Sequence, residues 1–381
     1  MFPVIKTIDD LLPHIQGNPQ IRVKTEDNGM TVVCYMLQDE DTFSGVAEEY
    51  ARECRGITFG PDGKIASRTL TKFFNIGERE DTQPHALRWV KVVRIMDKRD
   101  GSMVTPVLLP NMASFMFKTK KSFATKEAAL AQELCGDIDR YKWILKLLKD
   151  GFTPTFEVTS PRFPIVLCYE KDELTLLHIR ENITGRYLTE REIEGMTPPF
   201  PVVENLIGLF SVAKVTDVGV TNVVDWDMLK HAAETRTGIE GWIIQFDDGE
   251  MVKLKTKWYC DLHHAVTFTR WRDIARAVCD DKADDLKGAF TLTGRSIEPI
   301  LKVEREVKAT LGVVKGLVEV AVKFGHANNF DAKTMALTYK GAPNFGLIMT
   351  LFRGKDPDYM GWYVKNHLED DWGLEVVEVN A

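Results

Sequence analysis

The chain has 381 residues, which is enough for two domains or for one large domain with an appendage. Its 44% hydrophobic and 28% charged residues are typical of a folded protein and exclude intrinsic disorder as the main state. The formal net charge of -7 excludes a general attraction to polyanions, so a nucleic acid would have to meet a local basic patch.

No stretch approaches the roughly 20 apolar residues that a membrane span requires, and the N-terminal residues do not resemble a secretion signal. We therefore expect an intracellular protein without a membrane partner. The six cysteines are scattered with no CxxC pair and are expected to be free thiols. The adjacent His263 and His264 cannot both address one metal ion from a helix, because neighbouring helical residues point in different directions.

Up to about residue 265, short apolar runs alternate with turn residues and predict mostly antiparallel sheet with some helix. A hairpin turn is predicted at residues 247–249 (DDG), between an apolar run and Met251. One helix is predicted over residues 126–148, where apolar residues recur near helical spacing. The predicted strands include residues 31–35, 92–96, 152–158, 174–179 and 242–246.

Beyond about residue 265 the pattern becomes helical. Residues 274–290 are predicted to be helix, and Ser296 can cap a long helix that follows. One apolar stripe runs along that helix and comprises Ile300, Val303, Val307, Leu311, Val314, Val318 and Ala321. The sequence thus predicts an α+β protein, with an antiparallel-sheet domain over residues 1–265 and an all-helical domain over residues 266–381.

Residues 98–102 (KRDGS) follow a predicted strand and carry the clearest local signal of chemistry. A lysine followed by an acid and a glycine suits a nucleophilic amine, Lys98, beside a turn where the backbone can approach a phosphate. Asp-Gly is also a common hairpin turn, so a purely structural turn is the alternative interpretation.

Residues 253–257 (KLKTK) are predicted to be extended, and two-residue alternation would place all three ammonium groups on one face. Val252 and Leu254 would then occupy the opposite face. Neighbouring cations on a strand can bind a polyphosphate. The alternative is a solvated outer face of a sheet.

A lysine nucleophile must lose its proton before it attacks. At an unperturbed pKa near 10.4, on the order of 1 in 2,500 amines is neutral at pH 7, so the site must favour the neutral form. We expect the positive charges of Lys253 and Lys255 to contribute to this. Attack by Lys98 on the α-phosphate of a nucleotide would form a lysine phosphoramidate, with Mg²⁺ and basic groups balancing the charge on the departing pyrophosphate.

Two carboxylates are candidates for the remaining roles in such a site. Glu157 lies among β-forming residues, and Glu240 directly precedes Gly241 and another predicted strand. An acid in this setting is unfavourable unless it binds a group such as a sugar hydroxyl or a hydrated metal ion. For each acid the alternative is an exposed position on a strand.

The order of these segments resembles that of the covalent nucleotidyltransferases, the superfamily of ATP-dependent DNA and RNA ligases and capping enzymes. Motifs I, III, IV and V of that superfamily are similar to residues 98–102, Phe156-Glu157, Glu240-Gly241 and residues 253–255.

A finer resemblance is to the bacteriophage RNA ligase 1 family. Residues 53–57 (ECRGI) and 67–75, with Ser67-Arg68 and KFFN, are similar to family segments that other branches lack in this form. The resemblance continues through residues 117–120, 151–153, 180–182, 184–185 and 257–259 and is weaker beyond about residue 265. The sequence departs from the family pattern at Pro106 and Pro110, so the pairing of the strands between Ser102 and Phe115 is not predicted. Residues 196–237 also match the family poorly.

This resemblance implies a role for each matching residue. Lys98 would be the adenylated nucleophile, with Lys253 and Lys255 near the reacting phosphate, and Glu240 would bind a metal ion largely through water and phosphates. Lys118 and Lys121 have no implied role in the site and are expected to add to a basic rim for RNA. The residues implied to bind the nucleotide are Arg55, Lys72, Phe74, Gly101, Lys120, Glu157, Glu240 and Gly241.

The implied activity is that of an ATP-dependent RNA ligase, which joins 5′-phosphate and 3′-hydroxyl ends through lysyl-AMP and RNA-adenylate. The implied cofactors are ATP and Mg²⁺, with Mn²⁺ as a substitute. The implied partner is single-stranded or broken RNA, in particular tRNA repaired in the cytoplasm of a phage-infected bacterium. We expect a monomer whose helical tail contributes RNA specificity.

Two alternatives remain at this point. A DNA ligase or a GTP-dependent capping enzyme would usually continue into a β-barrel, which the helical pattern of the tail disfavours. A non-catalytic RNA-binding protein on the same scaffold is disfavoured because Lys98, Glu157, Glu240, Lys253 and Lys255 are all present together.

Overall fold

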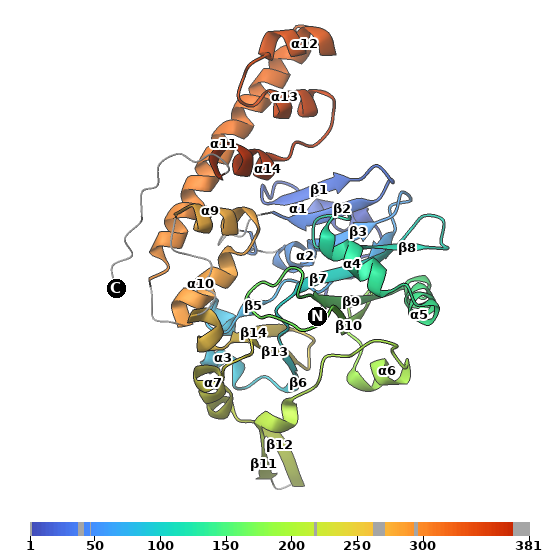
Figure 1. Ribbon diagram of the computed structural model, residues 1–381, viewed down its shortest axis with the longest axis vertical. Helices are drawn as coiled ribbons and strands as arrows, with labels where there is room; N and C mark the ends of the chain where they lie inside the picture. Colours follow the sequence, from blue (N-terminus) through green and yellow to red (C-terminus); the bar gives the residue numbers. More distant parts are fainter. Residues whose placement is uncertain are drawn as a thin grey trace. The chain divides into compact units, whose positions relative to one another are not determined.

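The structure is a computed structural model that describes residues 2–36, 42–45, 47–216, 219–261, 271–292 and 296–368. The chain divides into two compact units, Met1–His263 and His264–Ala381. Mainly antiparallel sheets with flanking helices make up the described part of the first unit, and helices that of the second (Figure 1). This arrangement confirms the predicted α+β class. The predicted boundary at residue 265 and the pair His263-His264 lie outside the described residues.

The first sheet contains β1 (Ile21–Thr25), β2 (Thr31–Tyr35), β3 (Arg55–Phe59) and β4 (Ile65–Ser67), each antiparallel to the next. Short η1 (Ile8–Asp10) and α1 (Leu12–Ile15) precede it. Ile57 and Phe59 of β3 are buried in the core of this sheet with Val33. α2 (Glu48–Glu53) ends just before β3, and Arg55 is the first residue of that strand. Burial of Ile57 and Phe59 in the core holds the strand, and therefore Arg55, in place.

The second sheet has the strand order β10-β9-β7-β8, with β7 (Ser102–Leu108), β8 (Phe115–Lys118), β9 (Phe152–Thr159) and β10 (Glu173–Glu181). The helices α4 (Lys126–Leu134) and α5 (Ile138–Lys149) pack against it, and Ala131 and Leu147 share a core with Phe156. Pro106 lies inside β7 opposite Phe117 of β8. Only residues 102–104 of β7 pair with β9, so the proline removes no bond to that strand.

The prediction of a single helix over residues 126–148 is wrong, because α4 and α5 are separate helices. Residues 135–137 lie between them. The Asp137 carboxylate accepts hydrogen bonds from the backbone N–H groups of Asp139 and Arg140, and this cap starts a new helix. The apolar pattern continues across the break because both helices cover the same sheet.

The third sheet has the order β5-β14-β13-β6, with β5 (Phe74–Asn75), β6 (Val92–Asp97), β13 (Gly241–Phe246) and β14 (Met251–Lys255). β13 is antiparallel to both β6 and β14, and β5 is parallel to β14. The predicted hairpin turn at residues 247–249 is confirmed, since Gly249 has a φ of 88° and its N–H donates to the Phe246 carbonyl. The start of β13 therefore lies between the ends of β6 and β14.

Residues 196–237 complete the core of the third sheet. β11 (Ser211–Thr216) and β12 (Gly219–Val224) form a two-stranded sheet between η3 (Ile207–Phe210) and α7 (Trp226–Thr235). Phe210 and Leu229 are buried with Trp242 of β13, and the Phe210 and Trp242 ring centroids are 5.3 Å apart. The remaining short helices of this unit are η2 (Glu80–Thr82), α3 (Pro84–Leu87) and α6 (Glu190–Gly195).

The described part of the second unit consists of α9 (Trp271–Cys279), α10 (Ala283–Leu292), α11 (Glu298–Ala327), α12 (Ala332–Tyr339), α13 (Phe345–Phe352), α14 (Tyr359–Tyr363) and η4 (Val364–Leu368). The predicted stripe on α11 is buried except for Leu311, which is half-buried. Ser296 Oγ accepts the N–H of Glu298 at 3.2 Å, although the residue directly before the helix is Ile297. The single helix predicted over residues 274–290 is wrong, since Asp281, with a φ of 62°, separates α9 from α10.

Across the described residues, no helix combines the length and the apolar character needed to cross a membrane. The six cysteines are free thiols, of which Cys168 is exposed and the other five are buried.

Candidate active site

Three segments meet at one end of the third sheet and bring two lysines to one carboxylate. Lys98 follows β6, Glu240 precedes β13 and Lys255 ends β14. Lys98 Nζ donates to Glu240 Oε1 at 2.6 Å, and Lys255 Nζ lies 3.2 Å from the same oxygen. The backbone supports this contact, since the Lys98 N–H donates to the Gly241 carbonyl at 2.9 Å and Gly241 pairs with Lys255. Sheet register therefore holds the three groups together.

Glu240 is a buried carboxylate with unused hydrogen-bonding capacity. Its side chain is 3% exposed, and Oε2 has no hydrogen-bond partner among the residues that the structure describes. Desolvation raises the pKa of Glu240, while the charges of Lys98 and Lys255 oppose the rise. The alternative of an exposed strand acid is excluded for Glu240, and its Oε2 keeps unused capacity to accept a hydrogen bond or bind a cation.

Lys253 and Lys255 are both buried on β14, and Leu254 between them belongs to the core of the third sheet. The alternative of a solvated outer face is excluded for these two residues. The predicted alignment is wrong for Lys257, because β14 ends at Lys255. Lys257 lies in a helical turn and pairs with Asp261 at 2.7 Å.

Residues 98–101 connect two different sheets and are not the turn of a hairpin. β6 belongs to the third sheet, whereas β7 belongs to the second. A Cβ on Gly101 would collide with the Val158 carbonyl oxygen and lie 3.0 Å from Glu157 Cγ. A glycine is therefore required where this loop packs on β9.

Asp100 anchors the same loop through four hydrogen bonds. Its Oδ2 accepts the N–H groups of Val166 and Leu167 at 2.8 and 2.6 Å, and Oδ1 accepts the Tyr259 hydroxyl at 2.7 Å. The Asp100 N–H donates to the Tyr169 hydroxyl oxygen at 3.0 Å. The sequence predicted no function for Tyr169 or Tyr259, although Tyr259 lies in a segment, residues 257–259, that carries the family resemblance.

Glu157 is half-buried on β9, opposite Met103 of β7. Desolvation raises the pKa of Glu157 to about 8, while the charge of Lys98 limits the rise and that of Glu240 adds to it. The raised pKa favours the protonated carboxyl group, which can donate a hydrogen bond to a neutral oxygen.

Gly241 is required by its close packing against β14. Its φ is 149°, and a Cβ would collide with the Leu254 carbonyl oxygen and lie 2.7 Å from Lys255 Cα. Any side chain here would separate β13 from β14 and move Glu240 away from Lys255.

Arg55 and Lys72 belong to a second cationic group, built from β3 and the segment before β5. The Arg55 guanidinium donates to the Thr71 carbonyl at 3.2 Å and lies 5.0 Å from the Phe73 ring centroid. Lys72 is buried, and its Nζ lies 4.8 Å from the Phe74 ring centroid. Two of the predicted phosphate-binding cations thus lie on two segments that hydrogen bonds join.

The ring of Phe74 is surrounded by cations. Besides Lys72, the guanidinium groups of Arg79 and Arg52 lie 4.6 and 5.7 Å from its centroid. Because β5 pairs with β14, Phe74 is tied to the strand that carries Lys253. The two cationic groups are therefore connected by the third sheet.

Lys120 and Lys118 differ sharply in their surroundings. Lys120 Nζ lies 4.0 Å from the Tyr35 ring centroid. Lys118 is completely buried and donates to the Gly56 carbonyl at 2.6 Å, so the expectation that it belongs to an RNA-binding rim is wrong. Desolvation lowers the pKa of Lys118 to about 8. This lysine ties the end of β8 to the residue after Arg55.

The site can place a polyanion beside the amine of Lys98. The Lys98 side chain is 19% exposed, whereas those of Glu240 and Lys255 are 3% exposed, so Lys98 is the group that an entering ligand can reach. Buried cations nearby would attract phosphate groups, and their low exposure weakens screening by water and salt.

No group of three or more His, Cys, Asp or Glu side chains that could hold a metal ion occurs among the described residues. A fully protein-bound metal ion therefore does not fit this part of the chain. An ion bound mainly by phosphates and water does fit, because Mg²⁺ keeps several waters and needs only one or two carboxylates. The unpartnered Oε2 of Glu240 supplies one.

The family model and the relatives found by sequence agree on one family. A family model described as RNA ligase matches residues 53–259. The chain is 30% identical over 328 residues to the "Putative RNA ligase" of Thermovibrio ammonificans, covering 83% of this chain and 79% of that protein. It is 26% identical over 331 residues to RNA ligase 1 of bacteriophage TS2126, covering 84% and 76%. Among solved structures, an archaeal ATP-dependent RNA ligase matches with 14% identity and a TM-score of 0.45, over 79% of this chain and 78% of that chain.

Proposed function

The chain belongs to the bacteriophage RNA ligase 1 family, and from this premise we propose that it is an ATP-dependent RNA ligase with Lys98 as its nucleophile. The Lys98 amine attacks the α-phosphorus of ATP, so that a P–N bond forms and the bond to pyrophosphate breaks. The AMP then passes to a 5′-phosphate of RNA. A 3′-hydroxyl finally attacks that phosphate, releases AMP and leaves a phosphodiester bond.

The contact of Lys98 and Lys255 with one oxygen of Glu240 is the observation that carries this proposal. For attack, the Lys98 amine must leave this bond and be unprotonated. Lys255 contacts the same oxygen, so Glu240 stays compensated by a positive charge when Lys98 moves to the phosphate. The carboxylate is thus not left alone in a buried site, which would be costly.

The other residues bind and orient the nucleotide. Arg55 and Lys72 hold the outer phosphates, Lys253 and Lys255 neutralise charge near the α-phosphate, and Lys120 helps to position the nucleotide. Gly101 and Gly241 keep the two loops packed on their neighbouring strands, Phe74 supports the cations around it, and Glu157 binds the ribose.

Glu240 is the residue that would hold a divalent metal ion, with phosphates and water as the other ligands. When bound, Mg²⁺ or Mn²⁺ would supply charge neutralisation for the departing pyrophosphate. This role agrees with the free Oε2 of Glu240.

The rival functions are disfavoured by separate observations. A DNA ligase or capping enzyme would usually continue into a β-barrel, whereas residues 271–292 and 296–368 contain helices and no strand. A non-catalytic RNA-binding protein would have no need for a partly exposed lysine held on a buried carboxylate.

The test is incubation of the protein with ATP labelled at the α-phosphate and Mg²⁺. The expected result is an acid-labile label on the protein that is absent in Lys98→Ala. Lys149→Ala, which removes an exposed lysine from the end of α5, should label like the wild type. Failure of the wild type to take up label contradicts the proposal, and a preference for GTP would instead indicate a capping enzyme.

For the RNA partner we propose broken single-stranded RNA, in particular cleaved tRNA, in the cytoplasm of an infected bacterium. The enzyme would act as a monomer, and the second unit would contribute RNA specificity. The family resemblance supports this part of the proposal. Sealing of 5′-phosphorylated single-stranded RNA, nicked duplex and cleaved tRNA should be compared in one assay, and faster sealing of the nicked duplex would contradict it.

A further inference from the structure

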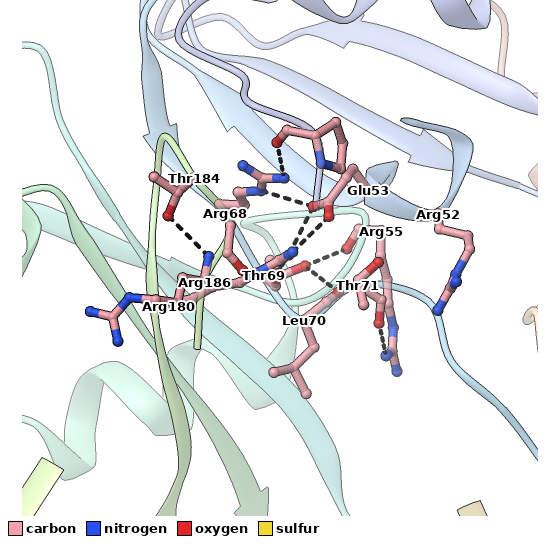
Figure 2. A network of polar contacts seen from close by, with 12 residues as sticks. Arg52, Glu53, Arg55, Arg68, Thr69, Leu70, Thr71, Arg180, Thr184 and Arg186 are labelled. Atoms are coloured by element: carbon pink, nitrogen blue, oxygen red, sulfur yellow. Dashed lines mark hydrogen bonds and ion pairs between the residues drawn. The ribbon is translucent and has the colours of Figure 1, made fainter. Parts of the chain in front are cut away.

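Glu53, Arg68 and Arg180 form a buried ion network that the proposed function does not use (Figure 2). Their side chains are at most 1% exposed. Arg68 Nε donates to Glu53 Oε2 at 2.9 Å, and Arg180 donates to both Glu53 oxygens at 2.8 and 2.6 Å. Glu53 is the last residue of α2, Arg68 directly follows β4, and Arg180 lies on β10. All three lie in segments that carry the family resemblance.

Backbone carbonyls take up most of the remaining donors of the two guanidinium groups. Arg68 donates to the carbonyls of Pro3, Asn182 and Ile183, and Arg180 to those of Thr69 and Gly185. Gly185 has a φ of 71°, and a Cβ there would lie 2.6 Å from Arg68 Cζ. The chain thus gives up a side chain at residue 185 to make room for the two arginines.

The charges of this network do not balance, so a contribution to folding stability does not by itself explain why the network is present. One carboxylate faces two guanidinium groups, so a net positive charge is buried. Desolvation raises the pKa of Glu53, but the attraction of Arg180 and Arg68 outweighs it and lowers the pKa to about 2. Replacing such buried ion groups with apolar residues is often neutral or stabilising. The fixed hydrogen-bonding directions of guanidinium groups point instead to control of backbone geometry.

The backbone that the network holds is the one that carries Arg55. Arg180 Nη1 donates to the Thr69 carbonyl at 2.7 Å, and the Thr69 hydroxyl donates to the Arg55 carbonyl at 3.0 Å. The Arg55 guanidinium in turn donates to the Thr71 carbonyl. Figure 2 shows these residues side by side.

The same two chain segments are joined again at Lys72. The Lys72 N–H donates to the Arg52 carbonyl at 2.8 Å, and Arg52 Nε donates to the Lys72 carbonyl at 2.9 Å. Residues 52–55 and 69–72 are therefore two hydrogen-bonded segments. The first contains Glu53, and the second contains Thr69, whose carbonyl accepts from Arg180. These bonds connect the network to the segments that carry Arg55 and Lys72.

We propose that Glu53, Arg68 and Arg180 are positioning residues that set the spacing of Arg55 and Lys72 for binding the phosphates of ATP. This inference rests on the proposed function. The network acts on the site through the backbone of these two cations, so its loss should weaken ATP binding in the first step. Sealing of RNA that is already adenylated brings no pyrophosphate into the site and should be spared.

The test compares Arg180→Lys and Thr69→Val with the wild type. Arg180→Lys keeps the charge but loses the forked contact with Glu53 and Thr69, and Thr69→Val removes the link to Arg55 without disturbing any charge. Both should raise the ATP concentration for half-maximal adenylation of Lys98 by about three- to tenfold, as loss of one hydrogen bond implies. Both should seal pre-adenylated RNA at the wild-type rate. Arg186→Lys is the matched control, because Arg186 pairs on the surface with Glu181 and Glu192.

A purely structural role would give a different result, namely an equal loss of both activities with an unchanged ATP requirement. That result, or a wild-type ATP requirement in both variants, overturns the inference. If Arg180→Lys does not fold, Thr69→Val decides the question. A wild-type enzyme that forms no lysyl-AMP would instead refute the proposed function, so the two failures are distinguishable.

Discussion

Lys98 and Glu240 are joined by a hydrogen bond of 2.6 Å although 142 residues separate them in the sequence. The bond exists because β6 and β13 are neighbours in the third sheet, with Trp242 paired to Asp97. Lys255 reaches the same carboxylate through the pairing of β13 with β14. The end of one sheet thus brings together the proposed nucleophile, a carboxylate and a second cation.

Replacing Glu240 with Gln removes the negative charge shared by Lys98 and Lys255. We expect adenylation to fall by about a hundredfold or more, because loss of one partner of a buried ion pair costs about 3 kcal/mol or more. The measurement is the rate of lysyl-AMP formation at saturating ATP. Glu194→Gln, an exposed change at the end of α6, should leave the rate within twofold of wild type. A normal rate in Glu240→Gln would show that this charge is not needed.

Replacing Gly101 with Ala forces the loop at residues 98–101 away from β9. The added methyl group would collide with the Val158 carbonyl oxygen, and overpacking of this kind costs about 1–3 kcal/mol. We expect a lower melting temperature together with slower adenylation. Gly195→Ala is the control, since nothing lies within 4 Å of a Cβ at Gly195. Equal stability of the two variants in urea would contradict the predicted contact.

Asp100 should matter more for stability than its place beside Lys98 suggests. Asp100→Asn leaves one oxygen for the three donors of Val166, Leu167 and Tyr259 and should cost about 2 kcal/mol in free energy of unfolding. Tyr259→Phe removes only one of these bonds and should cost about 1 kcal/mol. Denaturant unfolding measures both, with the exposed Asp9→Asn as the control. A larger loss in Tyr259→Phe than in Asp100→Asn would be inconsistent with this network.

Lys118 should make the stability of the protein increase with pH above neutrality. Desolvation lowers its pKa from 10.5 to about 8 in the folded state, so the unfolded chain binds more protons between these two values. A state that binds fewer protons gains relative stability as pH rises. The contribution of Lys118 to the free energy of unfolding should therefore grow by up to about 3 kcal/mol between pH 8 and 10.5.

The comparison of wild type with Lys118→Met isolates this contribution, because the other titrating groups are common to both proteins. Denaturant unfolding at pH 7 and pH 10 should give a smaller gain, or a larger loss, for the variant than for wild type. Lys149→Met, at an exposed position on α5, should follow the wild type. Parallel pH curves for wild type and Lys118→Met would show that Lys118 is not desolvated.

The sequence predicted elements wherever the local pattern decided the outcome. The predicted strand over 31–35 and the turn at Gly249 agree with the structure, because alternation and turn residues act over a few positions. The helices over 126–148 and 274–290 were predicted without their breaks. The helices break at Asp137 and Asp281. Neither residue disturbs the helical spacing of apolar residues on which the prediction rested.

For the candidate site, the sequence by itself supplied the candidate residues, since Lys98, Glu240 and Lys255 stand in recognisable segments. Tertiary structure decided which of them meet and which are buried. It placed Lys255 on Glu240 but turned Lys257 towards Asp261, and it buried Lys118 in a position that reads as surface. The physical reason is that motif spacing is a property of neighbouring residues. Sheet register and burial are set by packing between segments that are distant in the sequence. A local sequence pattern therefore cannot predict them.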